Sequence, residues 1–112
     1  MEFQNGTVKL SYTDETLYAN ISGEIDHHSA RIIREAIDAS LLAYSPEALV
    51  MDVSAISFMD SAGLGLVMGR YSKASEAGIA FTVTGVNPRI EKMFDMAGLD
   101  RIINYKSKEK KK

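Results

Sequence analysis

Ser61 is the residue whose type and position most clearly suggest chemistry. It follows Asp60 in residues 58–65 (FMDSAGLG), where a strand-like run gives way to a helical one. A hydroxyl held between an acidic neighbour and a helix N-terminus suits reversible phosphorylation, because helix amides can stabilise a phosphate. A serine at such a junction is also an ordinary helix N-cap, and Asp60 could cap equally well and leave the Ser61 hydroxyl in solvent. The residues themselves leave both interpretations open.

Other kinds of site fit the sequence poorly. Met59 occupies the first glycine position of a nucleophile elbow, and the chain is short for a hydrolase of that type. Residues 63–69 (GLGLVMG) miss the dinucleotide fingerprint by one position, no phosphate loop is present, and helix packing on a sheet or a partner explains these glycines better. His27 and His28 are adjacent, so they diverge by about 100° on a helix and cannot chelate one metal. We therefore expect no catalytic residue, cofactor or metal site, and no enzyme activity.

The elements that must hold Ser61 begin with a hairpin. Residues 7–12 and 17–21 alternate around a turn at Asp14 and Glu15, and Gly23 is expected to close the second strand. Asp26 then precedes a helix that Pro46 stops. The apolar face of this helix is predicted to hold Ala30, Ile33, Ala36, Ile37, Leu41 and Tyr44, and its solvated face to hold Arg31, Arg34, Glu35 and Asp38 in i,i+4 pairs.

The second half alternates strands and helices. Residues 48–53 are almost continuously apolar, as in a strand buried on both faces, and residues 79–84 form the next strand. The helix between them, about 62–77, is predicted to turn Leu64, Val67, Met68, Tyr71 and Ala74 to the core and Arg70, Lys73 and Glu76 to water. Asn87 and Pro88 then start a helix that buries Ile90, Met93, Phe94 and Ala97 and ends at Gly98, before a short edge strand at 101–105.

The predicted order, β-β-α-β-α-β-α-β, indicates one α/β domain over residues 1–105. We expect a mixed, mostly parallel sheet of about four to five strands faced by helices. Right-handed crossovers bring the three strand-to-helix loops to the same carboxyl edge of the sheet. The sequence therefore predicts a cluster at that edge of Glu24, Asp26, Asp52, Asp60 and Ser61.

Composition limits the partners and the location of the protein. The 112 residues are 46% hydrophobic, contain no cysteine, and include no secretory signal or apolar run near the ~18 residues of a membrane span. We expect a soluble, cytoplasmic protein without membrane contact. Residues 1–105 hold eight basic and fourteen acidic residues, whereas 106–112 hold five lysines and one glutamate. The acidic body argues against nucleic-acid binding, and residues 106–112 are expected to form a disordered basic tail.

Three motifs in order carry a resemblance to a known family. Residues 58–65, followed by Gly-Arg-Tyr at 69–71, residues 23–28 (GEIDHH) and residues 94–99 (FDMAGL) resemble the anti-sigma factor antagonists of the STAS family. The resemblance spans about residues 6–105 and is strongest to the sporulation type that governs sigma factor F.

What the resemblance implies is partner switching. The unphosphorylated antagonist of such families binds an anti-sigma factor that is also a serine kinase and so frees the sigma factor; phosphorylation releases the kinase, and a serine phosphatase resets the cycle. The motif assigns the phosphoacceptor role to Ser61, and the departure at Ala62, where relatives often carry a second hydroxyl, leaves one candidate in the motif. Partner contacts are expected at Asp26, Met59, Asp60, Leu64 and Arg70, and the free protein is expected to be a monomer.

Other functions stay open on the sequence. The same switch serves general stress responses, so a stress-response antagonist is an alternative to a sporulation one. A STAS scaffold or accessory module, in which Ser61 only caps a helix, is a second alternative. A small domain that binds a nucleotide or an anion through its loop cluster is a third, although phosphate-loop chemistry is missing.

Overall fold

A six-stranded sheet with helices packed on one face forms the framework of the protein. The computed structural model describes residues 1–108. In chain order the elements are β1 (Glu2–Phe3), β2 (Gly6–Thr13), β3 (Thr16–Ile25), α1 (His27–Tyr44), β4 (Ala48–Met59), α2 (Ser61–Glu76), β5 (Ala80–Val86), α3 (Pro88–Ala97), the 3₁₀ turn η1 (Leu99–Arg101) and β6 (Asn104–Ser107).

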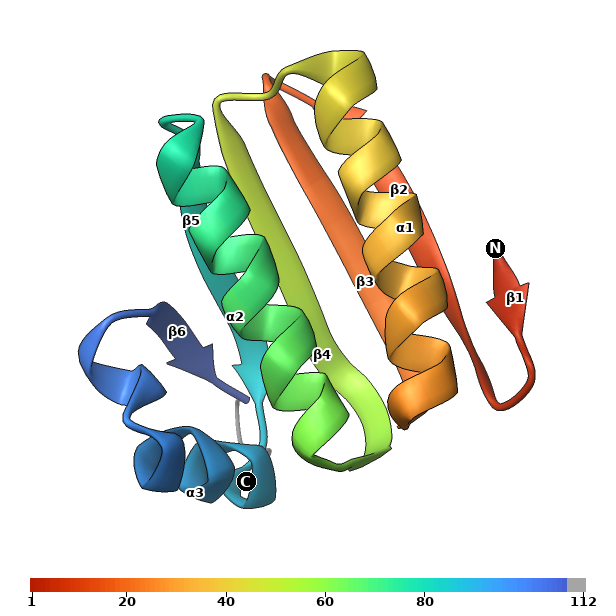
Figure 1. Cartoon of the computed structure of the whole chain (residues 1–112), viewed down its shortest axis with the longest axis vertical. Coiled ribbons are helices and arrows are strands. Elements are labelled where there is room, and N and C mark those ends of the chain that lie inside the picture. Colours follow the sequence, from red (N-terminus) through yellow and green to blue (C-terminus); the bar gives the residue numbers. More distant parts are fainter. Residues whose placement is uncertain (109–112) are drawn as a thin grey trace.

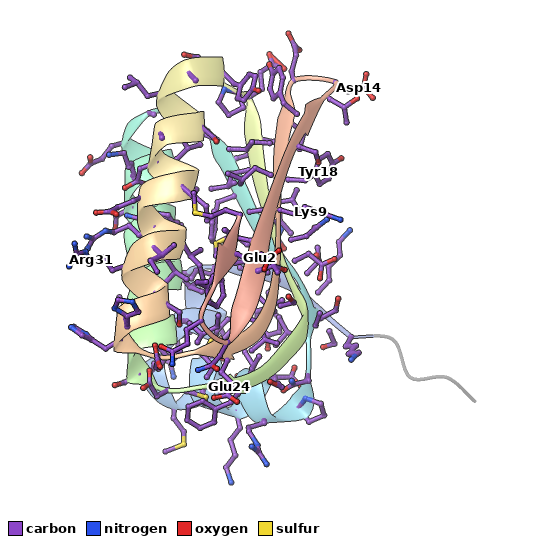
Figure 2. All side chains as sticks on the ribbon, turned by 90° about the vertical axis from the view of Figure 1, so that its right-hand side faces the viewer. Glu2, Lys9, Asp14, Tyr18, Glu24 and Arg31 are labelled. Atoms are coloured by element: carbon purple, nitrogen blue, oxygen red, sulfur yellow. The ribbon has the colours of Figure 1, made fainter. Side chains whose placement is uncertain are left out.

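The strands lie in the sheet in the order in which they occur in the chain. β1, β2 and β3 are antiparallel neighbours, and β3 to β6 are parallel. The predicted α/β class and mixed sheet are confirmed; the two-residue β1 is an additional strand. α1 and α2 lie side by side against the sheet (Figure 1). α1 and α2 leave the opposite face of the sheet open, and Lys9 and Tyr18 project from it (Figure 2).

The hairpin forms as predicted, with Asp14 and Glu15 at its turn in left-handed conformation (φ 50° and 61°). The second strand, however, does not close at Gly23. That glycine has φ 95° at an irregularity of β3, and a Cβ there would collide with the carbonyl oxygen of Asn5. The strand therefore continues past Gly23 to Ile25.

β4 is longer than the predicted strand at 48–53, because residues 54–59 continue it rather than forming a loop. Its pairing with β3 extends to Ile25 opposite Met59, with register shifts between Asn20 and Ser22 and between Gly23 and Glu24. Such irregularities disrupt the two-residue alternation by which a strand is recognised. One consequence corrects the predicted cluster: Asp52 pairs with Asn20 and Thr84 within the sheet and does not lie at its carboxyl edge.

α1 follows its predicted pattern closely. Its buried residues are Ser29, Ala30, Ile33, Ala36, Ile37 and Leu41. Tyr44 is the exception, because it is exposed and stacks on Tyr12 with ring centroids 4.5 Å apart. The exposed pair Arg31–Glu35 forms at 3.7 Å, but Asp38 pairs with Arg70 of α2 rather than with Arg34.

The predicted faces of α2 are partly wrong. Its buried residues are Gly63, Leu66, Val67, Arg70 and Ala74. Arg70, expected in water, is only 6% exposed, whereas Met68, expected in the core, is 44% exposed. Glycines weaken the apolar pattern of this helix, and Asp38 on α1 provides Arg70 with a partner that no local pattern predicts.

The C-terminal region confirms the predicted caps of α3, but the edge strand predicted at 101–105 lies at Asn104–Ser107, and Ala97, expected to be buried, is exposed. Asn87 caps α3 by accepting the Ile90 N–H at 2.8 Å, Pro88 is its first residue, and Gly98 ends it. β6 runs two residues beyond the predicted domain boundary at 105, and Lys108 Nζ donates to Ser54 O at 3.0 Å. The rest of the predicted tail, residues 109–112, lies outside the described residues. Within residues 1–108 no helix is both long and apolar enough to cross a membrane.

Candidate functional site

The parallel strands β3 and β4 bring two helix caps to one edge of the sheet. Ile25 and Met59 are register partners at the ends of these strands, and the Asp60 N–H donates to Ile25 O at 3.2 Å. The next residue on each chain segment caps a helix, Asp26 for α1 and Asp60 for α2. The N-termini of both helices therefore lie together at the lower edge in Figure 1.

Asp60, rather than Ser61, is the N-cap of α2. Its Oδ1 accepts the Ala62 N–H at 2.8 Å, and its backbone is extended (φ −106°, ψ −167°). Ser61 is consequently the first helical residue, and it is exposed. Of the two possible caps, Asp60 fills the role, and the Ser61 side chain stays accessible. A negative charge at this position is favoured by the first amides of the helix.

Asp26 is held by a reciprocal capping box. Its Oδ1 accepts the Ser29 N–H at 2.9 Å, and Ser29 Oγ accepts the Asp26 N–H at 2.9 Å. The backbone and side-chain hydrogen bonds from Ser29 lower the pKa of Asp26, against a smaller opposing effect of burial. The edge beside α2 therefore keeps an ionised carboxylate on a rigid support.

The predicted partner-contact residues differ in exposure. Asp26, Asp60 and Leu64 are half-buried and reach the surface. Met59 is buried beneath α2, where its side chain occupies the space that a Cβ on Gly63 would need, and Arg70 is buried as well. The side chains of Met59 and Arg70 are thus not displayed at this surface.

Phe58 is a surface residue that sequence reasoning missed. It is 46% exposed next to the buried Met59, and it pairs in register with Glu24 of β3, which is exposed as well. An aromatic side chain on the predicted 54–61 loop gave no signal of its direction. Once β4 is known to extend to Met59, strand alternation accounts for it.

Metal binding has little support at this edge. His27 and His28 are both exposed. Within residues 1–108 no three or more histidine, aspartate or glutamate side chains gather closely enough to hold a metal ion. The carboxylates of Asp26 and Asp60 are explained by their capping hydrogen bonds.

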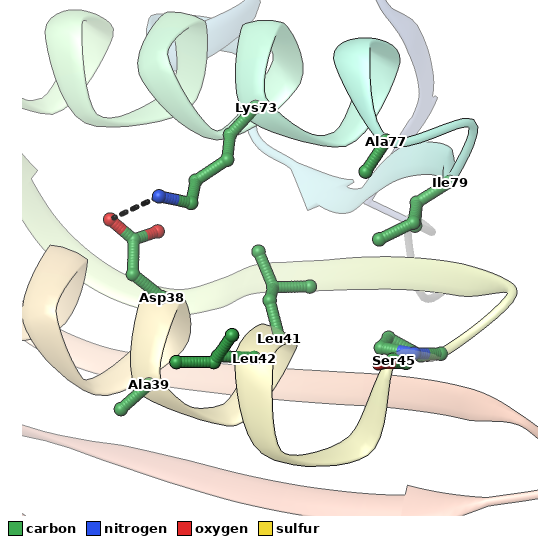
Figure 3. Close-up of a pocket in the computed structure, with 9 residues that line it drawn as sticks. Asp38, Ala39, Leu41, Leu42, Ser45, Lys73, Ala77 and Ile79 are labelled. Carbon is green, nitrogen blue, oxygen red and sulfur yellow. Dashed lines mark ion pairs between the residues drawn. The ribbon is translucent and has the colours of Figure 1, made fainter.

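A cavity of about 580 Å³ lies between the far ends of α1 and α2 (Figure 3). Aliphatic side chains including Leu41, Leu42 and Ile79 line it, and Lys73 Nζ lies 3.9 Å from Asp38 Oδ2 at one end. Lys73 is about 18 Å along α2 from Ser61, given 1.5 Å per residue. The cavity is therefore separate from the Ser61 edge.

Comparison with known proteins agrees with this arrangement. Residues 7–111 match the STAS domain family. This chain belongs to the STAS family. It is 32% identical over 99 residues to the anti-sigma F factor antagonist of Paenibacillus polymyxa, and the alignment covers 88% of this chain and 85% of that protein. It is 31% identical over 104 residues to the anti-sigma-B factor antagonist of Bacillus subtilis, covering 93% and 94%.

Solved structures show the same fold. SpoIIAA, an anti-sigma factor antagonist described as a Bacillus cell fate determinant, superposes in its unphosphorylated form with a TM-score of 0.76 at 28% identity, over 88% of this chain and 87% of that one. The phosphorylated form gives a TM-score of 0.72 at 28% identity, over 88% and 90%. The STAS fold of the present chain thus resembles a protein that has been solved in both phosphorylation states.

Proposed function

We propose that this STAS protein is an anti-sigma factor antagonist that is switched by phosphorylation of Ser61. In its unphosphorylated form it binds an anti-sigma factor with serine kinase activity, and the sigma factor is released. The observation that carries the proposal is the exposed Ser61 hydroxyl one residue after the Asp60 cap. Relatives named anti-sigma F factor antagonists and the two states of SpoIIAA support it.

Phosphorylation requires only an accessible hydroxyl group from the antagonist. The kinase transfers the γ-phosphoryl group of ATP to Ser61 Oγ; the hydroxyl proton passes to a base of the kinase, and ADP leaves. A serine phosphatase later hydrolyses the phosphoserine with water, which restores the hydroxyl and releases inorganic phosphate. ATP and the metal ion belong to the partner enzymes.

A phosphate on Ser61 changes charge without removing the helix cap. It adds roughly 1.5 to 2 negative charges beside Asp60, which repels an acidic partner surface and blocks an apolar one. The capping bond from Asp60 Oδ1 to Ala62 N does not involve Ser61. We therefore expect modification to change binding while leaving the fold intact.

The partner surface proposed around Ser61 combines polar and apolar groups. Asp26, Asp60 and Leu64 form part of it, and the exposed Phe58 adds an aromatic contact of the kind that dominates protein interfaces. Met59 and Arg70 support it from beneath, through Gly63 and through Asp38 respectively.

The modification site is tested by incubating the chain with the anti-sigma factor kinase of the same organism and ATP, followed by peptide mass spectrometry. We expect one phosphate, on Ser61, and none on Ser61→Ala. Phosphate transfer to another residue of the wild-type chain with Ser61 untouched would contradict the assignment.

The charge mechanism is tested by binding. Ser61→Asp should weaken kinase binding at least tenfold, whereas Ser61→Ala should retain it. Ser72→Asp is the matched control, because Ser72 is exposed on nearly the same face of α2 about 16 Å further along, beyond the screening length of about 8 Å. Equal affinities of Ser61→Asp and Ser61→Ala would refute the mechanism.

A general stress-response antagonist is the second candidate. It is favoured by the 31% identity to the anti-sigma-B factor antagonist of Bacillus subtilis over nearly the whole length of both chains. Competition between a sporulation anti-sigma factor and a stress-response anti-sigma factor for the purified chain distinguishes the candidates. The true partner should bind more tightly and should phosphorylate Ser61.

A further inference from the structure

A second hollow between α1 and α2 lies close to Ser61. It measures about 410 Å³ and begins at the same end of the helices as the two caps. Its lining consists of His27, Ala30, Arg31, Arg34, Ala62, Gly65, Leu66, Gly69 and Arg70. We call this set the arginine groove.

Two glycines keep the arginine groove open. A Cβ added to Gly65 or Gly69 would meet no heavy atom of residues 1–108 within 4 Å, apart from the adjacent residues and the backbone of the same helix. Gly63 of the same helix differs, because a Cβ there would collide with the Met59 side chain. The packing of the domain thus explains Gly63 but leaves Gly65 and Gly69 unexplained.

The groove concentrates positive charge on an acidic protein. Three of the eight basic residues in 1–105 line it. Among the described residues Arg31 pairs with the exposed Glu35, a contact that contributes little. Arg34 has no ion pair within residues 1–108, and Asp38 is shared by Arg70 and Lys73 at 3.0 and 3.9 Å. The cations therefore exceed the anions that face them.

Two guanidinium nitrogens of Arg70 have no hydrogen-bond partner among residues 1–108, although the side chain is buried. Its Nε lies 3.0 Å from Asp38 Oδ1, yet neither atom makes a well-aligned hydrogen bond within the described chain, and Arg70 Nη1 has no partner there either. Burial lowers the pKa of Arg70, Asp38 opposes this effect, and the charge of Arg34 lowers the pKa further. Arg34 and Arg70 are thus close enough to repel one another, and an anion near them would relieve the repulsion.

Ser61 stands beside this groove. Ser61 and Gly65 are four residues apart on α2, so they share a helix face, and Gly65 has no side chain to separate Ser61 from the groove. On the other wall, Arg31 extends from α1 away from the sheet (Figure 2). Guanidinium groups bind phosphate through charge-assisted hydrogen bonds.

We propose that the arginine groove is a phosphate-recognition site, occupied by the phosphoryl group of Ser61 or by that of a free phosphorylated compound. The first source rests on the proposed function, whereas the second does not. With phosphoserine as the source, Arg31 and Arg34 turn the phosphate toward α1. Phosphorylation then links the two helices and withdraws the phosphate from solvent, in addition to blocking the partner.

The first arm of the test needs no kinase, because phosphoserine is incorporated at position 61 during synthesis. The second pKa of its phosphate, near 6 for an unperturbed group, is followed by phosphorus NMR against pH. Arg31→Gln and Arg34→Gln should each raise this pKa by about 0.5 to 1 unit, by loss of a nearby cation. His27 and Arg70 also line the groove, and Asp60 and Asp26 lie beside Ser61, but all four are common to all variants.

Two control variants locate the effect. Lys9 lies on the open face of the sheet, and Lys9→Gln should change nothing. Arg89 of α3 lines a small depression with Phe58 and Met59. Arg89 is therefore the alternative cation that the phosphate of Ser61 would contact if it turned away from α1. A pKa that responds to Arg89→Gln and not to the α1 arginines would overturn the phosphoserine source.

The second arm titrates the unphosphorylated chain with inorganic phosphate and follows the amide signals of Gly65 and Gly69, with Gly78 beyond the far end of α2 as the reference. Shifts at Gly65 and Gly69 that disappear in Arg34→Gln, without any response in the first arm, support a free phosphorylated ligand. Absence of a response from the α1 arginines in both arms overturns the proposal. Neither result depends on whether a kinase modifies Ser61, so the proposed function is judged separately.

Discussion

The three glycines of α2, Gly63, Gly65 and Gly69, offer a sharp test of how the helix is packed. Gly65 and Gly69 have helical backbone and room for a Cβ, whereas a Cβ on Gly63 collides with Met59. Glycine in a helix interior costs about 0.8 to 1.0 kcal/mol relative to alanine. Gly69→Ala and Gly65→Ala should therefore each stabilise the protein by about 1 kcal/mol.

The expected size of the thermal shift follows from the chain length. An unfolding entropy of roughly 2.1 cal/mol/K per residue gives about 0.24 kcal/mol/K for 112 residues, so 1 kcal/mol corresponds to about 4 °C in Tm. In Gly63→Ala the same gain in helix propensity is offset by overpacking of about 1 to 3 kcal/mol. Its net effect should be a loss of up to about 2 kcal/mol.

Calorimetry at a fixed protein concentration measures all three variants, and urea unfolding checks that the m-value is unchanged. We expect Tm to rise in Gly65→Ala and Gly69→Ala and to fall or stay level in Gly63→Ala. Equal shifts of Gly63→Ala and Gly69→Ala, or a clear loss of stability in Gly69→Ala, would refute the packing described for α2. Stabilised variants that bind phosphate less well would show that the open groove is kept at the expense of stability.

Three further predictions concern stability and ionisation. Asp60→Ala should lose the helix cap and lower Tm by about 4 °C, equivalent to about 1 kcal/mol, in a thermal melt in which Asp60→Asn loses much less. Arg70→Gln should lower the free energy of unfolding in urea by about 2 to 3 kcal/mol, less than for a fully buried pair because Asp38 is a quarter exposed; no loss would mean that the pair is dispensable. Burial, and the hydrogen bond and charge of Glu91, raise the pKa of Tyr105 to about 12. The stability that protonated Tyr105 contributes is therefore present below pH 10 and is lost as pH rises to 12. The difference between the ultraviolet absorbance titrations of wild type and Tyr105→Phe should have its midpoint near pH 12.

Local signals in the sequence predicted much of the fold. Asp26, Asn87 and Gly98 mark helix ends through side-chain and backbone chemistry that acts within a few residues, and each of them caps a helix in the structure. Asp14 and Glu15 likewise form the turn between two alternating runs. Such features depend little on the rest of the chain.

The predictions were wrong where contacts between residues far apart in the sequence determine the structure. The path of β4 beyond Val53 depends on pairing with an irregular β3, and so the positions of Asp52 and Phe58 were not predicted. The burial of Arg70 depends on Asp38 from another helix. The sequence does not distinguish Asp60 from Ser61 as the cap of α2, because both side chains suit that position, and only the backbone at the end of β4 decides between them.

The order of the strands in the sheet has a consequence for how the chain folds. Every strand pairs with the strand next to it in the sequence, from β1 to β6, so no later segment must be inserted between two that have already paired. Pairing of consecutive strands keeps the sequence separation between contacting residues smaller than another order of the strands would, and a smaller separation favours faster folding. The sheet can therefore grow from the β2–β3 hairpin by adding one helix and strand at a time, in the direction in which a ribosome delivers them.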